Sequence, residues 1–239
     1  MPKTIAITGA SGLMGSALQR ALKARGDTVL RFRRGQASGP DERAWSPGEV
    51  LDPGVLDGID AVIHLAGEPI SQRWSDAAKE RILASREGGT RSIAEAIAGA
   101  PHKPILVCAS AVGIYGADRP ERVDEASTPG NDFLAQVCLA WESAADPARA
   151  AGARVVHVRL GVVLSTEGGA LEQMLPPFKL GMGGRVGDGK QAFPWVHIND
   201  AVQVFLLAVD DDQLQGPVNA VGPEELKNAG FTKALGEAL

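Results

Sequence analysis

The sequence predicts an α/β protein with a doubly wound parallel sheet and a small C-terminal lobe. Short apolar runs alternate with longer segments of helical periodicity, and this alternation is typical of such a sheet. The alternation stops at residues 165–195, which are rich in glycine and proline. We therefore expect a core at residues 1–164 and a substrate-side lobe at residues 165–239, with strand and helix elements of the second part returning to the core.

Five apolar runs predict strands at residues 4–8, 28–33, 60–66, 104–110 and 154–161. These runs lack polar alternation, which is typical of strands buried on both faces of a parallel sheet. Apolar residues at helical spacing predict helices at residues 13–24, 76–98, 132–145 and 200–209. The repetition of strand, helix and strand predicts right-handed crossovers between parallel strands.

The composition of the 239 residues is that of an ordinary globular protein, with 44% hydrophobic and 22% charged residues. The formal net charge of −5 disfavours nucleic acid and anionic membrane surfaces as partners. No run approaches the ~18 apolar residues of a membrane-spanning helix, and the N-terminus enters a predicted strand directly. Cys108 and Cys138 fit no metal-binding spacing, so we expect no metal site and a reducing, cytoplasmic location.

Three glycines follow the first predicted strand and open the first predicted helix: Gly9, Gly12 and Gly15 in ITGASGLMGSAL. In this context Gly9 permits a tight turn, Gly12 lets the backbone approach a pyrophosphate, and Gly15 allows the helix to pack closely on the sheet. Backbone N–H groups at the start of the helix then favour a bound anion. The loop predicts dinucleotide binding by a Rossmann-like core; the alternative is a glycine turn without a ligand.

The end of the second predicted strand indicates which dinucleotide binds. An acidic residue there is typical of NAD sites, whereas arginine accommodates the 2′-phosphate of NADP. The strand ends RFRRG, with Arg31, Arg33 and Arg34 and no carboxylate. We therefore predict NADP as the cofactor of the core, with Arg33 or Arg34, rather than both equally, contacting the phosphate. The alternative is a solvated basic strand end.

Several motifs together carry a resemblance to a known family. They are HLAG at 64–67, GEPISQRW at 67–74, SAVGIYG at 110–116 and GDGKQAFPWVHIND at 187–200. With the glycine loop, they resemble the atypical, epimerase-like branch of the extended short-chain dehydrogenase/reductase superfamily over essentially the whole chain. Members of that branch are usually labelled sugar-nucleotide epimerases or, loosely, cell-division inhibitor-like proteins. The resemblance implies a further C-terminal segment after Leu239.

The resemblance also implies which residues hold NADP. Arg86 lies where extended relatives carry an asparagine close to the nicotinamide-side ribose; it is equally interpreted as a helix-face arginine paired with Glu87 or an aspartate. The residues that match the cofactor site are Gly9, Ser11, Gly12, Leu13 and Met14 at the pyrophosphate, Arg33 and Arg34 at the 2′-phosphate, Leu65, Ala66 and Gly67 beside the adenosine ribose, and Arg86.

The usual catalytic pair of the superfamily, Tyr-x-x-x-Lys, is missing. By the resemblance, Phe133 occupies the tyrosine position and Val137 the lysine position, and neither side chain transfers a proton. Either other groups transfer the proton, or the protein binds NADP without turnover. The candidate groups are Ser110 and Tyr115, followed by Glu68 and His197. Tyr115 is equally interpreted as a packed loop residue, and His197 more readily as a structural residue at the start of a helix.

The substrate side departs from the family as well. Residues 187–191 match the pattern G-D-G-x-Q, but Phe193 and Pro194 replace the Arg-Asp with which extended epimerases grip a nucleotide diphosphate. This change disfavours a nucleotide sugar. The cations that could compensate are Lys190, Arg185 and Arg159. We expect Gln191 and Trp195 to contact the substrate, and Trp195 with Phe193 to favour something flatter or less charged.

These observations predict an NADP(H)-binding oxidoreductase or epimerase-like protein that acts on an unknown small molecule. The alternative is a non-catalytic NADP(H)-binding redox sensor or scaffold. A homodimer is a candidate assembly.

Overall fold

The computed structural model describes residues 1–117, 119 and 121–239, and its centre is a parallel sheet. Within these residues a seven-stranded sheet has the order β3-β2-β1-β4-β5-β6-β9, so the chain winds outward from β1 in both directions. The strands are β1 (Thr4–Thr8), β2 (Thr28–Arg33), β3 (Glu42–Ala44), β4 (Ala61–His64), β5 (Ile105–Ala111), β6 (Val155–Leu160) and β9 (Gly216–Ala220).

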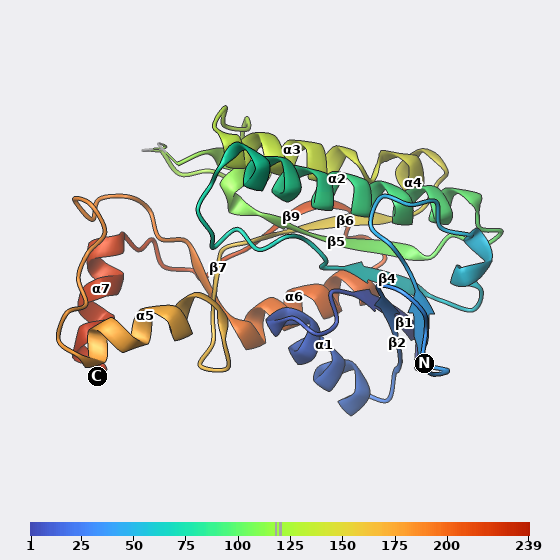
Figure 1. Ribbon diagram of the computed structural model, residues 1–239, viewed down its shortest axis with the longest axis horizontal. Helices are drawn as coiled ribbons and strands as arrows, with labels where there is room; N and C mark the ends of the chain where they lie inside the picture. Colours follow the sequence, from blue (N-terminus) through green and yellow to red (C-terminus); the bar gives the residue numbers. More distant parts are fainter. Residues whose placement is uncertain (118, 120) are drawn as a thin grey trace.

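Helices cover both faces of the sheet (Figure 1). The helices α2 (Asp76–Gly99), α3 (Phe133–Ser143) and α4 (Asp146–Ala150) lie on one face, and α1 (Leu13–Ala24) and α6 (Ile198–Asp210) lie on the other. Ile5 and Ile7 pack with the apolar residues of α1 and α6, whereas Ala6 packs with those of α2. Successive strand residues therefore face different helix layers, and both sets have to be apolar. No helix within the described part of the chain is long and apolar enough to cross a membrane.

After β6 the chain leaves the main sheet. The strands β7 (Val162–Leu164) and β8 (Trp195–His197) pair in parallel with each other. The helices α5 (Gly169–Lys179) and α7 (Asn228–Glu237) lie at the end of the molecule away from β2 (Figure 1). Phe193 stacks on Phe231 of α7 with ring centroids 4.1 Å apart, which gives this region an apolar centre. Between β8 and α7 the chain returns to the main sheet: α6 packs on its face, and β9 joins it as an edge strand.

All of the strands and helices predicted by residue range form, with ends within two residues of the expected ones. The helix expected at 132–145 is shorter, because it ends at Ser143 and α4 begins at Asp146 with Pro147 in its first turn. The strands β3 and β9 are not predicted. β9 has the sequence GPVNA, in which glycine and proline are typical of a turn, but it is an edge strand, the position in which a sheet tolerates proline.

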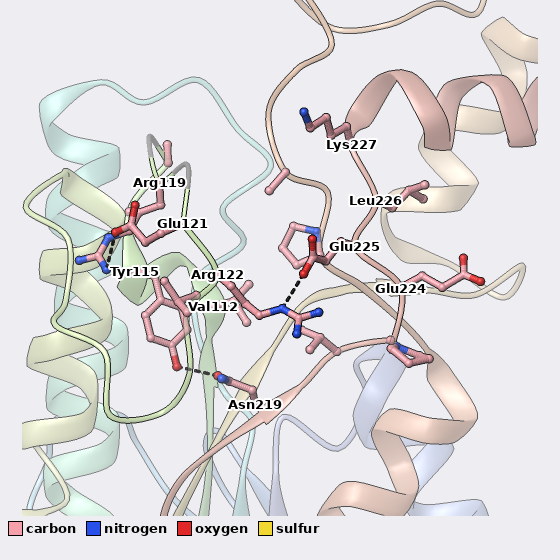
Figure 2. A pocket seen from close by; sticks show the side chains of 18 of the residues that line it. Val112, Tyr115, Arg119, Glu121, Arg122, Asn219, Glu224, Glu225, Leu226 and Lys227 are labelled. Atoms are coloured by element: carbon pink, nitrogen blue, oxygen red, sulfur yellow. Dashed lines mark hydrogen bonds and ion pairs between the residues drawn. The ribbon is translucent and has the colours of Figure 1, made fainter.

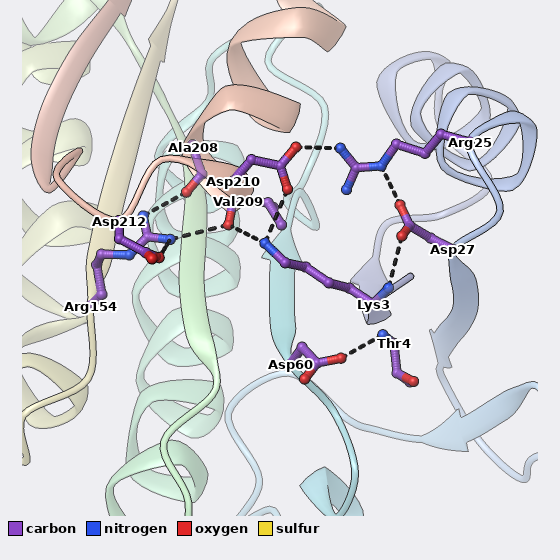
Figure 3. A network of polar contacts seen from close by, with 10 residues as sticks. All are labelled: Lys3, Thr4, Arg25, Asp27, Asp60, Arg154, Ala208, Val209, Asp210 and Asp212. Carbon is purple, nitrogen blue, oxygen red and sulfur yellow. Dashed lines mark hydrogen bonds and ion pairs between the residues drawn. The ribbon is translucent and has the colours of Figure 1, made fainter. Parts of the chain in front are cut away.

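Polar contacts occupy the amino end of the sheet (Figure 3). Lys3 donates from Nζ to the carbonyl oxygen of Val209 and to Asp210, both at 3.0 Å. Arg154 donates to the carbonyl oxygens of Ala208 at 2.7 Å and Val209 at 3.1 Å. These carbonyls lie in the last turn of α6, where they have no partner within the helix and where a nearby cation is favourable. The carboxyl end of the sheet is the end that remains for ligands.

Candidate functional site

The turn between β1 and α1 contains backbone contacts that only glycine permits. Gly9 has a φ of +65°, and a β-carbon there would lie 3.0 Å from the backbone nitrogen of Ala66, just after β4. A β-carbon on Gly15 would lie 2.7 Å from the α-carbon of Ala10 and closer still to the carbonyl oxygen of Gly9. Backbone atoms cannot move aside as a flexible side chain can. The turn, α1 and the end of β4 therefore form one closely packed unit.

The start of α1 is open in front of this turn. Gly12 is the N-cap residue, and no side chain within the described residues caps the first turn of the helix. Ser11 and Gly12 are exposed, and Leu13 and Met14 are half-buried. A β-carbon on Gly12 would meet only the carbonyl oxygen of Gly9, at 3.3 Å. Uncapped N–H groups with open space in front of them suit an anion such as a phosphate.

The end of β4 forms a second wall beside the glycine turn. The hydroxyl oxygen of Thr8 accepts from the backbone N–H groups of Leu65 at 3.0 Å and Ala66 at 3.2 Å, which fixes the exit of the strand. Gly67 is exposed, and a β-carbon there would lie 3.2 Å from the guanidinium carbon of Arg86. The structure thus brings the glycine turn, the predicted strand end and Arg86 together.

Arg86 is fixed by backbone acceptors and by an aromatic ring. It donates to the carbonyl oxygen of Glu68 at 2.9 Å, and its guanidinium carbon lies 4.9 Å from the ring centroid of Trp141 in α3. Burial lowers the pKa of Arg86, although a guanidinium stays charged at neutral pH. The alternative pairing with Glu87 is not present, because Glu87 faces Arg91 at 3.6 Å instead. The structure therefore presents a cation at the edge of this wall.

The two arginines at the end of β2 differ in their partners. Nη1 of Arg33 lies 2.9 Å from the hydroxyl of Ser38 and 3.4 Å from a carboxylate oxygen of Glu42 in β3. Arg34 is exposed and makes no hydrogen bond or ion pair with residues in the described ranges. Glu42 also accepts from the hydroxyl of Ser38 at 2.6 Å and from its N–H at 2.9 Å, and these bonds lower the pKa of Glu42 to about 2. The motif RFRRG holds no carboxylate, but β3 supplies one.

Ser110 lies in a buried polar cluster at the carboxyl end of β5. Its hydroxyl donates to Glu142 of α3 at 2.7 Å. Glu142 also accepts from Nε and Nη2 of Arg159 in β6, both at 2.9 Å. Burial raises the pKa of Glu142, but the hydrogen bonds from Arg159 and Ser110 lower it below its ordinary value. Glu142 is therefore ionised at neutral pH. The hydroxyl proton of Ser110 is engaged in the hydrogen bond to that carboxylate.

Tyr115 lines a cavity whose volume is about 660 Å³ (Figure 2). The cavity lies between the segment that starts at η2 (Val112–Tyr115) and residues 219–227, which lead into α7. The phenolic oxygen accepts from Nη1 of Arg159 at 2.9 Å, and the hydroxyl donates to Oδ1 of Asn219 at 2.7 Å. A cavity of this size accommodates a small molecule. Of the two preferred catalytic candidates, Tyr115 lines this cavity and Ser110, which is 2% exposed, lies buried beside it.

Charged side chains are among those that line this cavity. Arg122 and Glu225 come from opposite walls and pair at 2.5 Å (Figure 2). Lys190 and Lys227 line the wall formed by the C-terminal part of the chain. The lining thus combines charged side chains with apolar ones such as Val112.

Apolar side chains occupy the two positions in α3 at which the resemblance places the catalytic pair. The ring of Phe133 packs edge to face on Trp74 with centroids 5.4 Å apart, and Nζ of Lys79 lies 5.6 Å from its centre. Val137 is 2% exposed and belongs to the core. Neither side chain can carry a proton.

The two residues expected to contact the substrate, Gln191 and Trp195, are adjacent in sequence to residues that line the cavity. Within the described residues neither Gln191 nor Trp195 lines it, although their neighbours Lys190, Ala192 and Pro194 do. Gln191 donates from its side-chain amide to a backbone carbonyl at 3.0 Å, and Trp195 pairs with Val162 in the β7–β8 sheet. Their contact with a substrate stays a prediction.

Other residues named from the sequence have structural contacts. Phe193, which we expected to favour a flat substrate, is stacked on Phe231 and only 8% exposed. Arg159, one of the three cations that could compensate for the missing Arg-Asp, is paired with Glu142. His197 is the N-cap of α6, where its Nδ1 accepts from the N–H of Asn199 at 3.2 Å.

Comparison with known proteins identifies the family. A family model described as the NAD-dependent epimerase/dehydratase family matches residues 5–222. The chain belongs to this family. An epimerase family protein of Mycobacterium bovis is 45% identical over 238 residues, which cover 98% of this chain and 78% of the relative. The epimerase family protein SDR39U1 of Bos taurus is 40% identical, over 98% of this chain and 80% of the relative.

Solved structures of the family share the fold. A nucleoside-diphosphate sugar epimerase from Corynebacterium glutamicum is similar with a TM-score of 0.88 and 42% identity; the match covers 98% of this chain, which spans 50% of that one. The human epimerase family protein SDR39U1 with NADPH is similar with a TM-score of 0.85 and 34% identity, over 98% of this chain and 79% of that one.

Of three further residues in this epimerase-family site, the sequence does not point to Glu142 or Asn219, and it points to Arg159 only as a cation for the substrate. Arg159 gives the strongest signal, because it is a charged residue within an otherwise apolar buried strand and such a residue needs a partner. Its partner Glu142 lies 17 residues earlier in α3, and nothing local links the two. Asn219 belongs to β9, whose sequence is typical of a turn.

Proposed function

We propose that this epimerase-family protein binds NADP(H) across the carboxyl end of its sheet and catalyses an oxidoreductase or epimerase-like reaction on a small molecule in the Tyr115 cavity. The observation that carries the proposal is the glycine turn, in which a β-carbon at Gly9 or Gly15 would collide with backbone. This close packing leaves the uncapped start of α1 facing outward, which suits a pyrophosphate.

The arginines after β2 support NADP(H) over NAD(H). Arg33 ends β2 and Arg34 follows it, and arginine at this place in a dinucleotide-binding core supports a site for the 2′-phosphate of NADP(H). A guanidinium pairs more strongly with a charged phosphate than with a neutral ribose hydroxyl. The human relative at 34% identity, which is described with NADPH, adds to this support. When bound, the nicotinamide supplies hydride transfer to or from a carbon of the substrate.

Tyr115 is the side chain that we propose as proton donor and acceptor. Tyr115 lines the cavity, and Nη1 of Arg159 donates to its phenolic oxygen, where a guanidinium stabilises negative charge. In this respect Arg159 takes the part that lysine has in the usual pair. Ser110 acts as a positioning residue, since its bond to Glu142 helps to orient Arg159.

A second candidate function is a redox sensor or scaffold that binds NADP(H) without turnover. The observation that favours it is the packing of Phe133 and Val137, which leaves the usual catalytic positions of α3 without a proton-transfer group. The two candidates share the cofactor and differ only in turnover.

The proposed reaction is tested by measuring NADPH oxidation against a panel of carbonyl compounds and sugar nucleotides. We expect turnover of at least one compound, and we expect Tyr115→Phe to lower kcat by about 100-fold or more without changing the Kd for NADPH. Ser110→Ala should cause a smaller loss and shift the pH profile of kcat. Tight NADPH binding without any turnover would contradict the enzyme and support the sensor.

We also propose a cytoplasmic location for the protein. Cys108 and Cys138 are both buried and unpaired, and burial raises the pKa of Cys138 to about 11, so its thiol stays protonated. Two buried free thiols suit a reducing compartment.

A further inference from the structure

We infer that Glu42 is a specificity-determining residue that limits the preference of this protein for NADP(H) over NAD(H). The inference rests on the proposed NADP(H) site and assigns a role to a residue from a different strand. Glu42 lies in β3, outside the RFRRG motif that predicts the cofactor, and it is only 8% exposed.

The strand register places this carboxylate on the face of the sheet that α1 covers. Glu42 is directly opposite Arg31 in the β2–β3 pair, and Arg31 is opposite Ile7 in the β1–β2 pair. Ile7 packs with α1, so Glu42 shares the face of the sheet on which α1 lies. Gly9, two residues after Ile7, begins the glycine turn that leads into α1.

The carboxylate of Glu42 accepts from hydrogen-bond donors that could otherwise bind a phosphate. It lies 3.4 Å from Nη1 of Arg33 and 3.2 Å from Nη2 of Arg31. It also accepts from both the hydroxyl and the N–H of Ser38. Two guanidinium groups, a hydroxyl and a backbone N–H gathered around one anion are the donor set typical of a phosphate site.

Glu42 therefore acts as an internal anion that competes with the 2′-phosphate for Arg33. The hydrogen bonds from Ser38 lower its pKa to about 2, so Glu42 carries this negative charge at neutral pH. The incoming phosphate has to share Arg33 with the carboxylate and meets its repulsion at short range. A ribose 2′-hydroxyl carries no charge, so the carboxylate does not repel it. Arg34, which has no partner within the described ranges, remains fully available to the phosphate.

The variant Glu42→Gln tests this role, because glutamine keeps the shape and an acceptor for Ser38 while it removes the charge. Kd values for NADPH, NADH and 2′,5′-ADP are measured by titration calorimetry for the wild type and the variant. We expect binding of NADPH and 2′,5′-ADP to tighten by about tenfold and the Kd of NADH to change less than about twofold. Glu237→Gln removes the same charge from exposed α7 at the other end of the molecule and should change no Kd (Figure 1).

An unchanged ratio of the NADPH and NADH Kd values in Glu42→Gln, or weaker NADPH binding, would overturn the inference while the proposed function stood. A wild type that binds neither dinucleotide would instead overturn the proposed function together with the inference. If thermal melts show that Glu42→Gln does not fold, Glu42→Thr replaces it, because a β-branched residue suits the edge strand β3 and also removes the charge. The same tightening of NADPH binding is expected for that variant.

Discussion

Two buried histidines, His64 in β4 and His157 in β6, show how strongly the sheet constrains single residues. His64 is fully buried, and its Nδ1 lies 2.8 Å from the hydroxyl of Thr8. His157 is 2% exposed, and its Nε2 lies 3.0 Å from Nη2 of Arg149. Each ring has a second nitrogen for which the described residues offer no partner. A proton on either ring would place a charge in an apolar interior.

We predict that acid destabilises the protein through these histidines. Burial lowers the pKa of both His64 and His157 from 6.5 to about 4. Between these values the unfolded chain binds protons that the folded chain does not, so the free energy of unfolding falls as pH falls from 6.5 toward 4. Each histidine contributes a slope of up to about 1.4 kcal/mol per pH unit, and therefore about 3 kcal/mol per histidine between pH 6.5 and pH 4.

Urea denaturation at pH 7, 6 and 5 measures this slope. His64→Asn, which cannot titrate, should be less stable at pH 7 but should lose less stability than the wild type on acidification. A free energy of unfolding that is constant from pH 7 to pH 5 in the wild type would contradict the prediction.

At the scale of elements, the unit of β1, the glycine turn and α1 is the part of the proposed dinucleotide site that local sequence predicts best. Its bounds, its backbone geometry and its place at the carboxyl end of the sheet all follow from local sequence, because glycine spacing and helix periodicity are local properties. The β5–α3–β6 cluster does not follow in this way. Ser110, Glu142 and Arg159 come from three elements, and only the folded sheet brings them within hydrogen-bonding distance.

We predict that Gly15→Ala damages both the stability of this unit and its ligand binding. The added methyl group would meet the backbone of Gly9 and Ala10, which cannot move without shifting α1. We expect a loss of about 1–3 kcal/mol in the free energy of unfolding, measured by urea denaturation, and weaker binding of NADPH. Gly236→Ala in α7 is the matched control, because a β-carbon there meets nothing within 4 Å and alanine favours a helix. Equal stability of Gly15→Ala and the wild type would show that the contact is not rigid.

At the scale of the whole molecule, the sheet separates structural contacts from functional ones. Polar pairs such as Lys3 with Asp210 hold the amino end (Figure 3), and the glycine turn, the arginines and the cavity lie toward the carboxyl end. This separation is a consequence of parallel topology, in which all strand ends of one kind meet at one edge. The sequence therefore predicts where the site lies once the strands are recognised.

The substrate cavity is much harder to predict, because its walls are loops from distant parts of the chain. Tyr115 comes from η2 and Asn219 from β9. Lys190 comes from the segment before β8, and Lys227 from the segment before α7. β9 and the turns around it lack the periodicity that identifies a core element. The sequence names Tyr115 as a candidate but cannot supply its partners Arg159 and Asn219. The homodimer and the roles of Gln191 and Trp195 stay predictions.

Calorimetric titration of the wild-type protein with NADPH and with NADH tests the central claim most directly. We predict that NADPH binds with one site per chain and about tenfold or more tightly than NADH, because a guanidinium of Arg33 or Arg34 at the end of β2 would pair with the 2′-phosphate. We also expect Arg33→Ala combined with Arg34→Ala to weaken NADPH binding far more than NADH binding. Equal affinities of the wild type for the two dinucleotides, or a preference for NADH, would contradict this claim.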